Sequence, residues 1–181
     1  MVKLRLVALL AIFAVSGCET AGPPPPPPPP PPPTVPRDEI VIHAPYRAED
    51  FAWSTAIGSA RIHISTVAGR SCTGNSVALT PDTPYSRERI RALYGSSESA
   101  SEPVERVRSR VIGNDNADMR RFVRAGRCDA TGAFFFDGLP AGSFFVIAEV
   151  SDPRGPRVVM RRVTTAAGRL SNVALTAAAK P

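Results

Sequence analysis

Arginine dominates one stretch of this 181-residue chain, from Tyr85 to Arg127. The stretch holds ten arginines against six acidic residues, and Arg87, Arg89 and Arg91 stand at every second position near its start. The planar fork of an arginine binds a carboxylate or a phosphate through two parallel hydrogen bonds. We therefore take these three arginines, with Tyr94 nearby, as candidate contacts to an acidic partner. Lipid phosphates, peptidoglycan carboxylates and an anionic polysaccharide all have the required chemistry.

The same pattern has a simpler interpretation, in which the arginines form a solvated surface. Twenty of the 22 basic residues in the chain are arginine, and the two exceptions are Lys3 and Lys180. Arginine is thus preferred everywhere, so its local density need not mark a binding site. We expect no nucleic-acid partner, because no basic stripe alternates with exposed aromatic residues. A solvated surface and an acidic-partner site both stay open.

Residues suited to catalysis or metal binding are scarce. The chain holds two histidines, His43 and His63, and neither is near a cysteine in the sequence. There is no Gly-x-Ser-x-Gly elbow, His-Glu-x-x-His pair or phosphate-binding loop. Oxygen ligands alternate from Asn114 to Asp118, but a calcium-binding EF-hand would need Gly and Glu where Met119 and Ala125 stand. We expect no metal, no cofactor and no enzyme activity; the alternative is an unrecognised hydrolase whose carboxylates meet only in the fold.

Length and composition indicate one globular domain with appendages. A net charge of +6 and a hydrophobic content of 43% exclude a multipass membrane protein, a coiled coil and a fully disordered chain. The first 17 residues are typical of an export signal, with Lys3 and Arg5 preceding the apolar run Leu6–Val15. As a helix this run would span about 15 Å, half of the roughly 30 Å of a bilayer core.

The residues that follow carry a lipidation motif. Val15-Ser16-Gly17-Cys18 resembles the bacterial lipobox, in which a branched apolar residue and two small residues precede a cysteine. The resemblance implies cleavage before Cys18 and three acyl chains on the new N-terminal residue, enough for a stable membrane anchor. Glu19 is not the Asp that often retains lipoproteins in the inner membrane, which favours the outer membrane. The alternative is an ordinary secretory signal with an incidental cysteine.

A polyproline tether is expected between Cys18 and the globular domain. Eleven consecutive prolines run from Pro23 to Pro33. In the polyproline II conformation they would extend roughly 34 Å at about 3.1 Å per residue. We predict a stiff spacer over residues 18–39, with a ligand for a proline-binding groove as the alternative.

Two further cysteines would meet in an oxidising compartment after export. Cys72 follows the apolar alternation around Ile62, and Cys128 precedes the one around Phe134. A cysteine pair in such a compartment forms a disulfide by default, so we predict a Cys72–Cys128 bridge. Closing a loop of about 57 residues would stabilise the fold by roughly 4 kcal/mol. A metal-binding or nucleophilic cysteine is the alternative.

Short strands separated by Gly and Pro turns fill the chain from Ile40 onward. Ala60, Ile62 and Ile64 alternate with polar residues, and this period of two predicts a half-buried strand. The same pattern or a short apolar run predicts strands at Val77–Thr80, Ala133–Phe136, Ser143–Val150, Arg157–Thr165 and Leu170–Thr176. This spacing is typical of a β-sandwich.

Alternation within two of these strands predicts the core. One face holds six apolar residues: Phe134, Phe136, Phe144, Val146, Ala148 and Val150. Each large side chain would contribute roughly 2–3 kcal/mol on burial. A ligand-stacking platform is the alternative for this aromatic row. Phe135 and Phe145 point the other way, and we take them as candidates for a partner surface.

The arginine-rich stretch interrupts the strands and predicts a polar insertion over one edge of the sandwich. Ser86 is a candidate cap for a short helix that ends at Gly95. Ser96–Ser101 is expected to be a flexible polar run, and Asp118–Val123 a second short helix.

The last third of the chain resembles a known domain family. Its pattern is similar to the signature of carboxypeptidase regulatory-like domains, although Phe144 replaces the usual Tyr: Asp129-x-x-Gly132-x-Phe134-x-Phe136-x-x-Leu139-Pro140-x-Gly142-x-Phe144-x-Val146. The resemblance implies an all-β fold, a single transthyretin-like (prealbumin-like) Greek-key β-sandwich at residues 40–181. The short helical insertion would occupy about residues 84–127. Relatives serve as appendages, stalks and lipoproteins rather than as catalytic units.

Together, these expectations predict a general function but no specific ligand. The chain would be a non-catalytic lipoprotein of the cell envelope, with its β-sandwich acting as a structural or protein-interaction module. The alternative is a binding module for an anionic envelope glycan or a lipid head group.

Overall fold

The computed structural model describes residues 39–67 and 69–175 of the chain. The expected signal peptide at 1–17, the lipidation site Cys18 and the polyproline run lie outside the described residues.

The smaller of the two sheets of the sandwich contains the strand predicted around Ile62. Its three strands are β2 (Ala60–Thr66), β7 (Ala133–Leu139) and β10 (Leu170–Leu175). β2 lies in the middle, antiparallel to β7 and parallel to β10. In the register of β2 and β7, His63 stands opposite Phe135.

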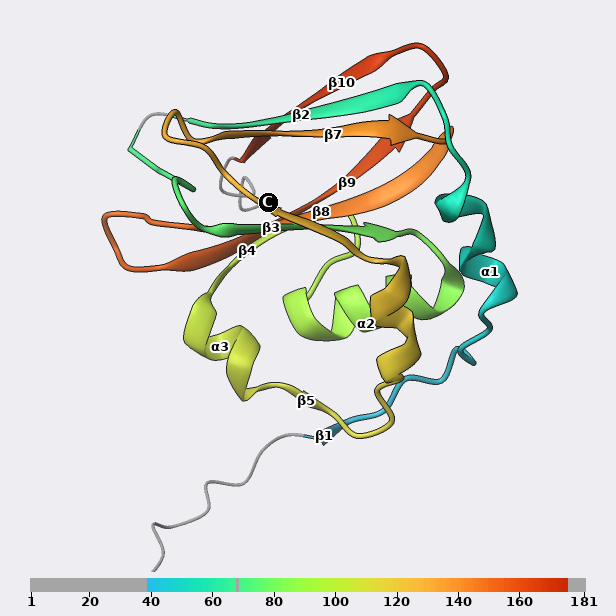
Figure 1. Cartoon of the computed structure of the whole chain (residues 1–181). Helices are drawn as coiled ribbons and strands as arrows, with labels where there is room; N and C mark the ends of the chain where they lie inside the picture. The colour runs from blue at the N-terminus through green and yellow to red at the C-terminus, as the bar shows by residue number, and fades with distance from the viewer. Residues whose placement is uncertain (1–38, 68, 176–181) are drawn as a thin grey trace, which may run out of the picture. The chain divides into compact units, whose positions relative to one another are not determined.

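A larger sheet packs against the smaller one and completes a sandwich (Figure 1). Its strands, in sheet order, are β4 (Ser99–Pro103), β9 (Arg157–Thr165), β8 (Gly142–Val150), β3 (Ser76–Pro81) and β6 (Arg124–Arg127). All neighbours in this sheet are antiparallel. The all-β sandwich with a short helical insertion, predicted from the sequence, is confirmed.

The core between the sheets follows the predicted alternation. Phe136, Phe144 and Val146 are buried there beside Ile62 and Ile64 of β2. Ala148 and Val150 are buried as predicted, and Phe134 is partly buried against the same cluster. The inward aromatic row is therefore core rather than a platform for a ligand.

The insertion begins with a capped helix, α2 (Pro84–Tyr94). Its cap is Thr83 rather than the predicted Ser86: the Thr83 hydroxyl accepts from the backbone N–H of Ser86, and the Ser86 hydroxyl accepts from that of Thr83. Proline at the first position suits the helix start, where no intrahelical partner for its N–H is needed. Gly95 ends the helix with φ of 78°, as predicted.

The rest of the insertion joins the larger sheet instead of crossing one edge of the sandwich. The predicted flexible run Ser96–Ser101 leads into β4, and Arg124–Arg127 forms β6, so the insertion supplies both edge strands of this sheet. Ser99–Pro103 becomes ordered because it pairs residue by residue with β9. Between the two edges lie α3 (Val104–Ser109), β5 (Val111–Ile112) and a 3-10 helix, η2 (Ala117–Phe122), where a short helix was expected.

The segment before the sandwich packs against the insertion. Its elements are β1 (Glu39–Ile40), α1 (Glu49–Ala52) and the 3-10 helix η1 (Trp53–Thr55). β1 pairs in parallel with β5, and Phe51 is buried with Ile42, Tyr85 and Met119 in a separate apolar cluster. This cluster fixes the entry of the chain beside α2.

The predicted disulfide joins Cys72 to Cys128, with their Cα atoms 5.7 Å apart. Both cysteines are buried in the core, and the bridge closes a loop with a sequence separation of 56. That loop contains β3, α2, β4, α3 and β6, so the bridge links the start of the β3 segment to the end of the insertion.

Candidate functional site

Helix α2 divides its residues between the protein interior and an outward face. Ile90, Leu93 and Tyr94 pack onto the outer face of the larger sheet. Arg87 and Arg91 lie one helical turn apart on the outward face, because residues four apart stack on the same side of a helix. Figure 1 shows α2 on the side of the larger sheet that faces away from the smaller one.

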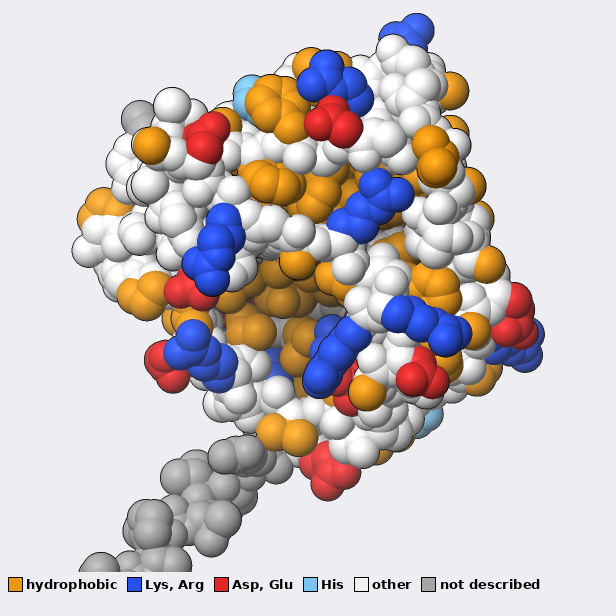
Figure 2. All heavy atoms as spheres, viewed as in Figure 1, with side chains coloured by type: hydrophobic (Ala, Val, Ile, Leu, Met, Phe, Trp, Pro, Cys, Tyr) orange, Lys and Arg blue, Asp and Glu red, His pale blue; other side chains and the backbone are white. Residues whose placement is uncertain are grey.

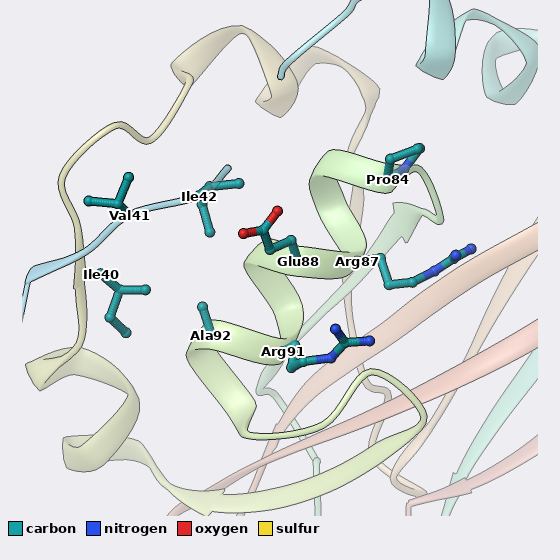
Figure 3. Close-up of a pocket in the computed structure, with 8 residues that line it drawn as sticks. All are labelled: Ile40, Val41, Ile42, Pro84, Arg87, Glu88, Arg91 and Ala92. Carbon is teal, nitrogen blue, oxygen red and sulfur yellow. The ribbon is translucent and has the colours of Figure 1, made fainter. Parts of the chain in front are cut away.

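An open cavity of about 570 Å³ lies on this outward face. The chain segment Ile40–Ile42 forms one side, and α2 forms the rest through Pro84, Arg87, Glu88, Arg91 and Ala92. In Figure 3 the Arg87 and Arg91 side chains extend side by side in one direction, while the isoleucine side chains stand across the helix from them. The cavity therefore has a basic side and an apolar side.

Hydrogen bonds to its main chain hold the segment Ile40–Ile42, the apolar side of the cavity, in place. The Gly113 N–H donates to the Ile40 carbonyl at 3.0 Å. The Asn114 side chain accepts from the Ile42 N–H at 2.9 Å and donates to the Ile42 carbonyl at 2.7 Å. Val41 between them is 53% exposed. These bonds present an apolar side chain to solvent from a fixed backbone.

Glu88 is the carboxylate among the residues that line the cavity, and it is engaged by the backbone. It accepts hydrogen bonds from the N–H groups of His43 at 2.9 Å and Ala44 at 2.7 Å. These two bonds are the main reason that the pKa of Glu88 lies below its ordinary value. Both carboxylate oxygens are thus bonded to the entering segment, and the nearby charge of Arg91 also helps to lower this pKa.

The buried carboxylate of Asp82 orients Arg87. Its Nε donates to Asp82 Oδ1 at 2.9 Å, and Arg162 donates to the other oxygen at 2.6 Å. The Asp82 side chain is fully buried, while that of Arg87 is 43% exposed. The hydrogen bond to Asp82 is the main cause that raises the pKa of Arg87 above its ordinary value. The guanidinium is therefore both charged and fixed in direction.

Arg91 contributes the second cation. Its Nη2 lies 3.3 Å from the Ser97 hydroxyl. Within residues 39–67 and 69–175, no Asp or Glu forms an ion pair with Arg91. Two guanidinium groups thus share one open cavity, and the second has hydrogen-bonding capacity to spare.

Arg89, the third predicted arginine, lies elsewhere. It forms a bidentate pair with Asp115, with Nε–Oδ1 at 2.8 Å and Nη2–Oδ2 at 3.2 Å. The Arg89 hydrogen bond is the main cause that lowers the pKa of Asp115, and the Tyr85 hydroxyl donates to the same carboxylate. Arg89 therefore fastens the loop after β5 to α2. The predicted group of three is split into a pair at the cavity and one structural residue.

Two of the predicted partner-surface aromatics are buried. Tyr94 is 8% exposed and Phe145 is fully buried, packed together with Met160 beneath α2. Phe145 does point away from the core between the sheets, as its parity predicted. The prediction that it reaches a surface was wrong, because the insertion covers that face of the larger sheet.

Phe135 is exposed, as predicted, on the outer face of the smaller sheet. Its ring stacks on His63 with centroids 4.4 Å apart, and Arg61 Cζ lies 5.5 Å from the ring centroid. His63 Nδ1 lies 3.2 Å from the Asn172 side-chain oxygen. His63 is therefore engaged by a ring and an amide.

The described part of the chain has neither a cluster of potential metal ligands nor a helix suited to span a membrane. No group of three or more His, Cys, Asp or Glu residues in residues 39–67 and 69–175 is placed to hold a metal ion. In the same residues, no helix has the length and apolar character needed to cross a bilayer.

Sequence reasoning missed the apolar side of the cavity and the carboxylate beneath it. Helical spacing carried a usable signal, since Arg87 and Arg91 are one turn apart while Arg89 is about 200° away on the helix. The contribution of Ile40–Ile42 had no local signal, because it depends on pairing with residues about seventy positions later in the chain, such as Asn114.

Comparison with known proteins yields a distant likeness in fold. Neither a protein-family model nor a curated protein matches this sequence. A crystal structure of a protein from Pseudomonas aeruginosa, described as a "putative carbohydrate binding protein", is similar at 20% sequence identity with a TM-score of 0.48. The likeness covers 72% of this chain and 97% of that one.

Proposed function

We propose that this chain is a non-catalytic, lipid-anchored module of the bacterial cell envelope that binds an acidic glycan in the cavity on α2. One observation carries the proposal: Arg87 and Arg91 lie side by side at an open cavity whose own carboxylate, Glu88, is occupied by backbone N–H groups. Two neighbouring guanidinium groups suit the carboxylates of successive uronic or muramic acid residues.

The apolar side of the cavity supports a sugar over a simple inorganic anion. A sugar ring presents C–H groups on its faces and hydroxyls at its edges, so it can pack against Val41 while its carboxylate reaches Arg91. The volume of about 570 Å³ suits a small-molecule site, for which about 300–1,000 Å³ is usual. Because the cavity is open, a polymer can pass through it with only one or two sugars in contact.

In this proposal, the N-terminal features place the site near a membrane. A lipid on Cys18 would hold the chain at the membrane, and the prolines from Pro23 to Pro33 would space the domain from the lipid surface. A module on such a tether would reach polymers in the space beside the membrane. The lipid, the tether and the outer-membrane location are parts of the proposal.

The test is a binding titration with a galacturonic acid hexamer and its fully methyl-esterified form. The pair has the same backbone, but only the acid carries charge. Isothermal titration of the full chain, at low and at physiological salt, should show binding to the acid alone that weakens as salt rises.

Matched variants separate the cavity from general surface charge. Arg91→Gln should weaken binding of the acid hexamer about tenfold, since a charge-assisted hydrogen bond contributes about 1.5–3 kcal/mol and 1.4 kcal/mol is tenfold. Arg108→Gln removes one charge of another exposed arginine, on α3, and should change the affinity less than about twofold. Equal losses in the two variants, or equal binding of the esterified hexamer, would overturn the proposal. Recovery of an envelope protein alone in a crosslinking experiment would favour the protein-interaction alternative.

A further inference from the structure

The outer face of the smaller sheet is a surface that the cavity on α2 does not use. Three strands place their outward side chains here: Arg61 and His63 from β2, Phe135 and Asp137 from β7, and Leu170 and Asn172 from β10. Within the described residues, no helix of the insertion packs on this face. Figure 2 shows a histidine, a hydrophobic, a basic and an acidic side chain gathered at the top of the view, over β2 and β7.

Phe135 is held in one orientation while remaining 43% exposed. Stacking on His63 at an interplanar angle of 14° occupies one face of its ring. The other face points away from His63, toward the outer side of β7. Since β7 is an edge strand, no further strand of the described sheet covers that side. His63 on one face and Arg61, with its Cζ 5.5 Å from the ring centroid, fix the ring, and the rest of its surface is open to solvent.

The charges of Arg61 and Asp137 beside this ring neutralise each other. Arg61 Nε donates to Asp137 Oδ1 at 2.5 Å, and both side chains are more than half exposed. Arg124 donates from Nη1 to the main-chain carbonyl of Asp137 at 3.1 Å. Arg124 is thus bonded to the main chain, and the Arg61–Asp137 pair itself offers donors and acceptors in planar groups with no net charge. A partner that complements it carries hydroxyls, which both donate and accept, and no formal charge.

The size of the face limits what can bind there. Three strands about 4.8 Å apart, with about six residues each at about 3.3 Å per residue, give an area of about 300 Å². A stable protein interface needs about 800 Å² on each partner, so this face alone is too small for a second copy of the chain or another folded domain. A slender polymer fits within it.

We propose that this face is a second binding site, which takes uncharged sugar rings of a neutral glycan. One ring stacks its C–H groups on the free face of Phe135, because the π-face of an aromatic ring carries partial negative charge. The hydroxyls of that sugar or its neighbour bond to the Arg61–Asp137 pair. Asn172, bonded to His63, offers its amide N–H₂ to the next sugar on the side of β10. The site differs from the cavity on α2 in residues, sheet and charge.

The experiment is a titration of the isotopically labelled full chain with three neutral hexasaccharides, observed by NMR. The probes are cellohexaose, maltohexaose and the hexamer of N-acetylglucosamine. At least one should shift the signals of Phe135, His63 and Asn172, and Phe135→Ala should weaken its binding about tenfold. Leu170→Ala is the matched control: it removes a side chain of similar exposure, 47% against 43%, from the far strand of the same face and should change the affinity less than twofold.

Further outcomes keep the two proposals distinguishable. Arg91→Gln should leave binding of the neutral hexamer unchanged, and Phe135→Ala should leave binding of the galacturonic acid hexamer unchanged. The proposed site on the smaller sheet is wrong if no neutral hexamer shifts these signals at millimolar concentration, or if Phe135→Ala and Leu170→Ala weaken binding equally. Either result leaves the proposal for α2 untouched, because its probe and variants are different.

Discussion

Phe145 on β8 and Phe135 on β7 hold equivalent outward positions on the two sheets, yet Phe145 is fully buried while Phe135 is 43% exposed. Each follows a phenylalanine that faces the core between the sheets, Phe144 in β8 and Phe134 in β7. The local patterns are nearly the same. The difference arises because the insertion places α2 on one outer face, whereas no helix among the described residues covers the other.

The comparison shows how one insertion gives the two outer faces of a two-layer sandwich different surfaces. Covering one face adds an apolar cluster of α2 and sheet residues, which stabilises the domain and places Arg87, paired with Asp82, and Arg91 beside an open cavity. Leaving the other face bare keeps a preformed group of ring, amide and ion pair in contact with solvent. The two proposed sites are therefore consequences of one asymmetry.

Truncating the two phenylalanines is the most direct way to break this comparison. Phe145→Ala should lower the free energy of unfolding by about 3–5 kcal/mol, because a buried ring is removed and a cavity is left. Phe135→Ala should cost less than about 1 kcal/mol, since the ring is half in water. Urea unfolding followed by fluorescence of Trp53, the one tryptophan of the chain, measures both. Similar losses for the two variants would mean that α2 does not cover Phe145 firmly in solution.

Loss of the disulfide should produce the next largest effect. The bridge ties the two ends of the segment that carries α2 and both edge strands of the larger sheet. Replacing both cysteines, as Cys72→Ala with Cys128→Ala, should lower the free energy of unfolding by about 2–4 kcal/mol, chiefly by freeing the unfolded chain. Chemical denaturation of the variant beside the oxidised parent gives the difference. A loss below about 1 kcal/mol would show that the unfolded insertion is already compact without the bridge.

The sequence was informative where structure depends on alternation and local chemistry. A period of two placed Ile62, Phe136 and Val146 in the core, and export predicted the disulfide. Gly95 was identified as the end of α2, because a left-handed residue there strongly favours glycine.

The sequence was uninformative where a position depends on distant partners. The polar run from Ser96 looks flexible by composition, and only pairing with β9 makes Ser99–Pro103 a strand. Parity gave the direction of Phe145 correctly, but whether that direction ends in water or under a helix depends on where the insertion folds. The cavity was missed for the same reason: Ile40–Ile42 lies beside α2 because of bonds to Gly113 and Asn114.

The cap of α2 offers a finer test of the covered face. Thr83 accepts from the Ser86 N–H, so Thr83→Ala should leave that buried donor without a partner and cost about 1 kcal/mol. Thr83→Ser keeps the hydroxyl and should restore most of the loss, apart from one buried methyl group. Thermal unfolding separates the two variants. If both lose the same amount, the side chain acts through packing rather than as a cap.

Acid should weaken the contact between α2 and the segment at His43 and Ala44 by protonating Glu88, and it should not affect the outer face of the smaller sheet. Hydrogen bonds from the His43 and Ala44 N–H groups lower the folded pKa of Glu88, so its contribution to stability is complete above the unfolded value of about 4.3. The contribution is lost as the pH falls through the lowered folded pKa. The amide signals of His43 and Ala44 should therefore shift in this acidic range, while the methyl signals of Leu170 on the bare face stay constant.

Two substitutions decide whether Glu88 causes that shift. Glu88→Gln has no carboxylate to titrate, and its single carbonyl oxygen is a weaker acceptor, so the acid step at His43 and Ala44 should disappear. Glu105→Gln removes an exposed carboxylate of α3 that bonds to neither His43 nor Ala44, so it should leave the step unchanged. If the step persists in Glu88→Gln, a different acidic residue causes the shift at His43 and Ala44. The two hydrogen bonds to Glu88 would then not explain the pH dependence of this segment. The effect is the smallest of the four because the carboxylate stays close to solvent, where water competes for the same bonds.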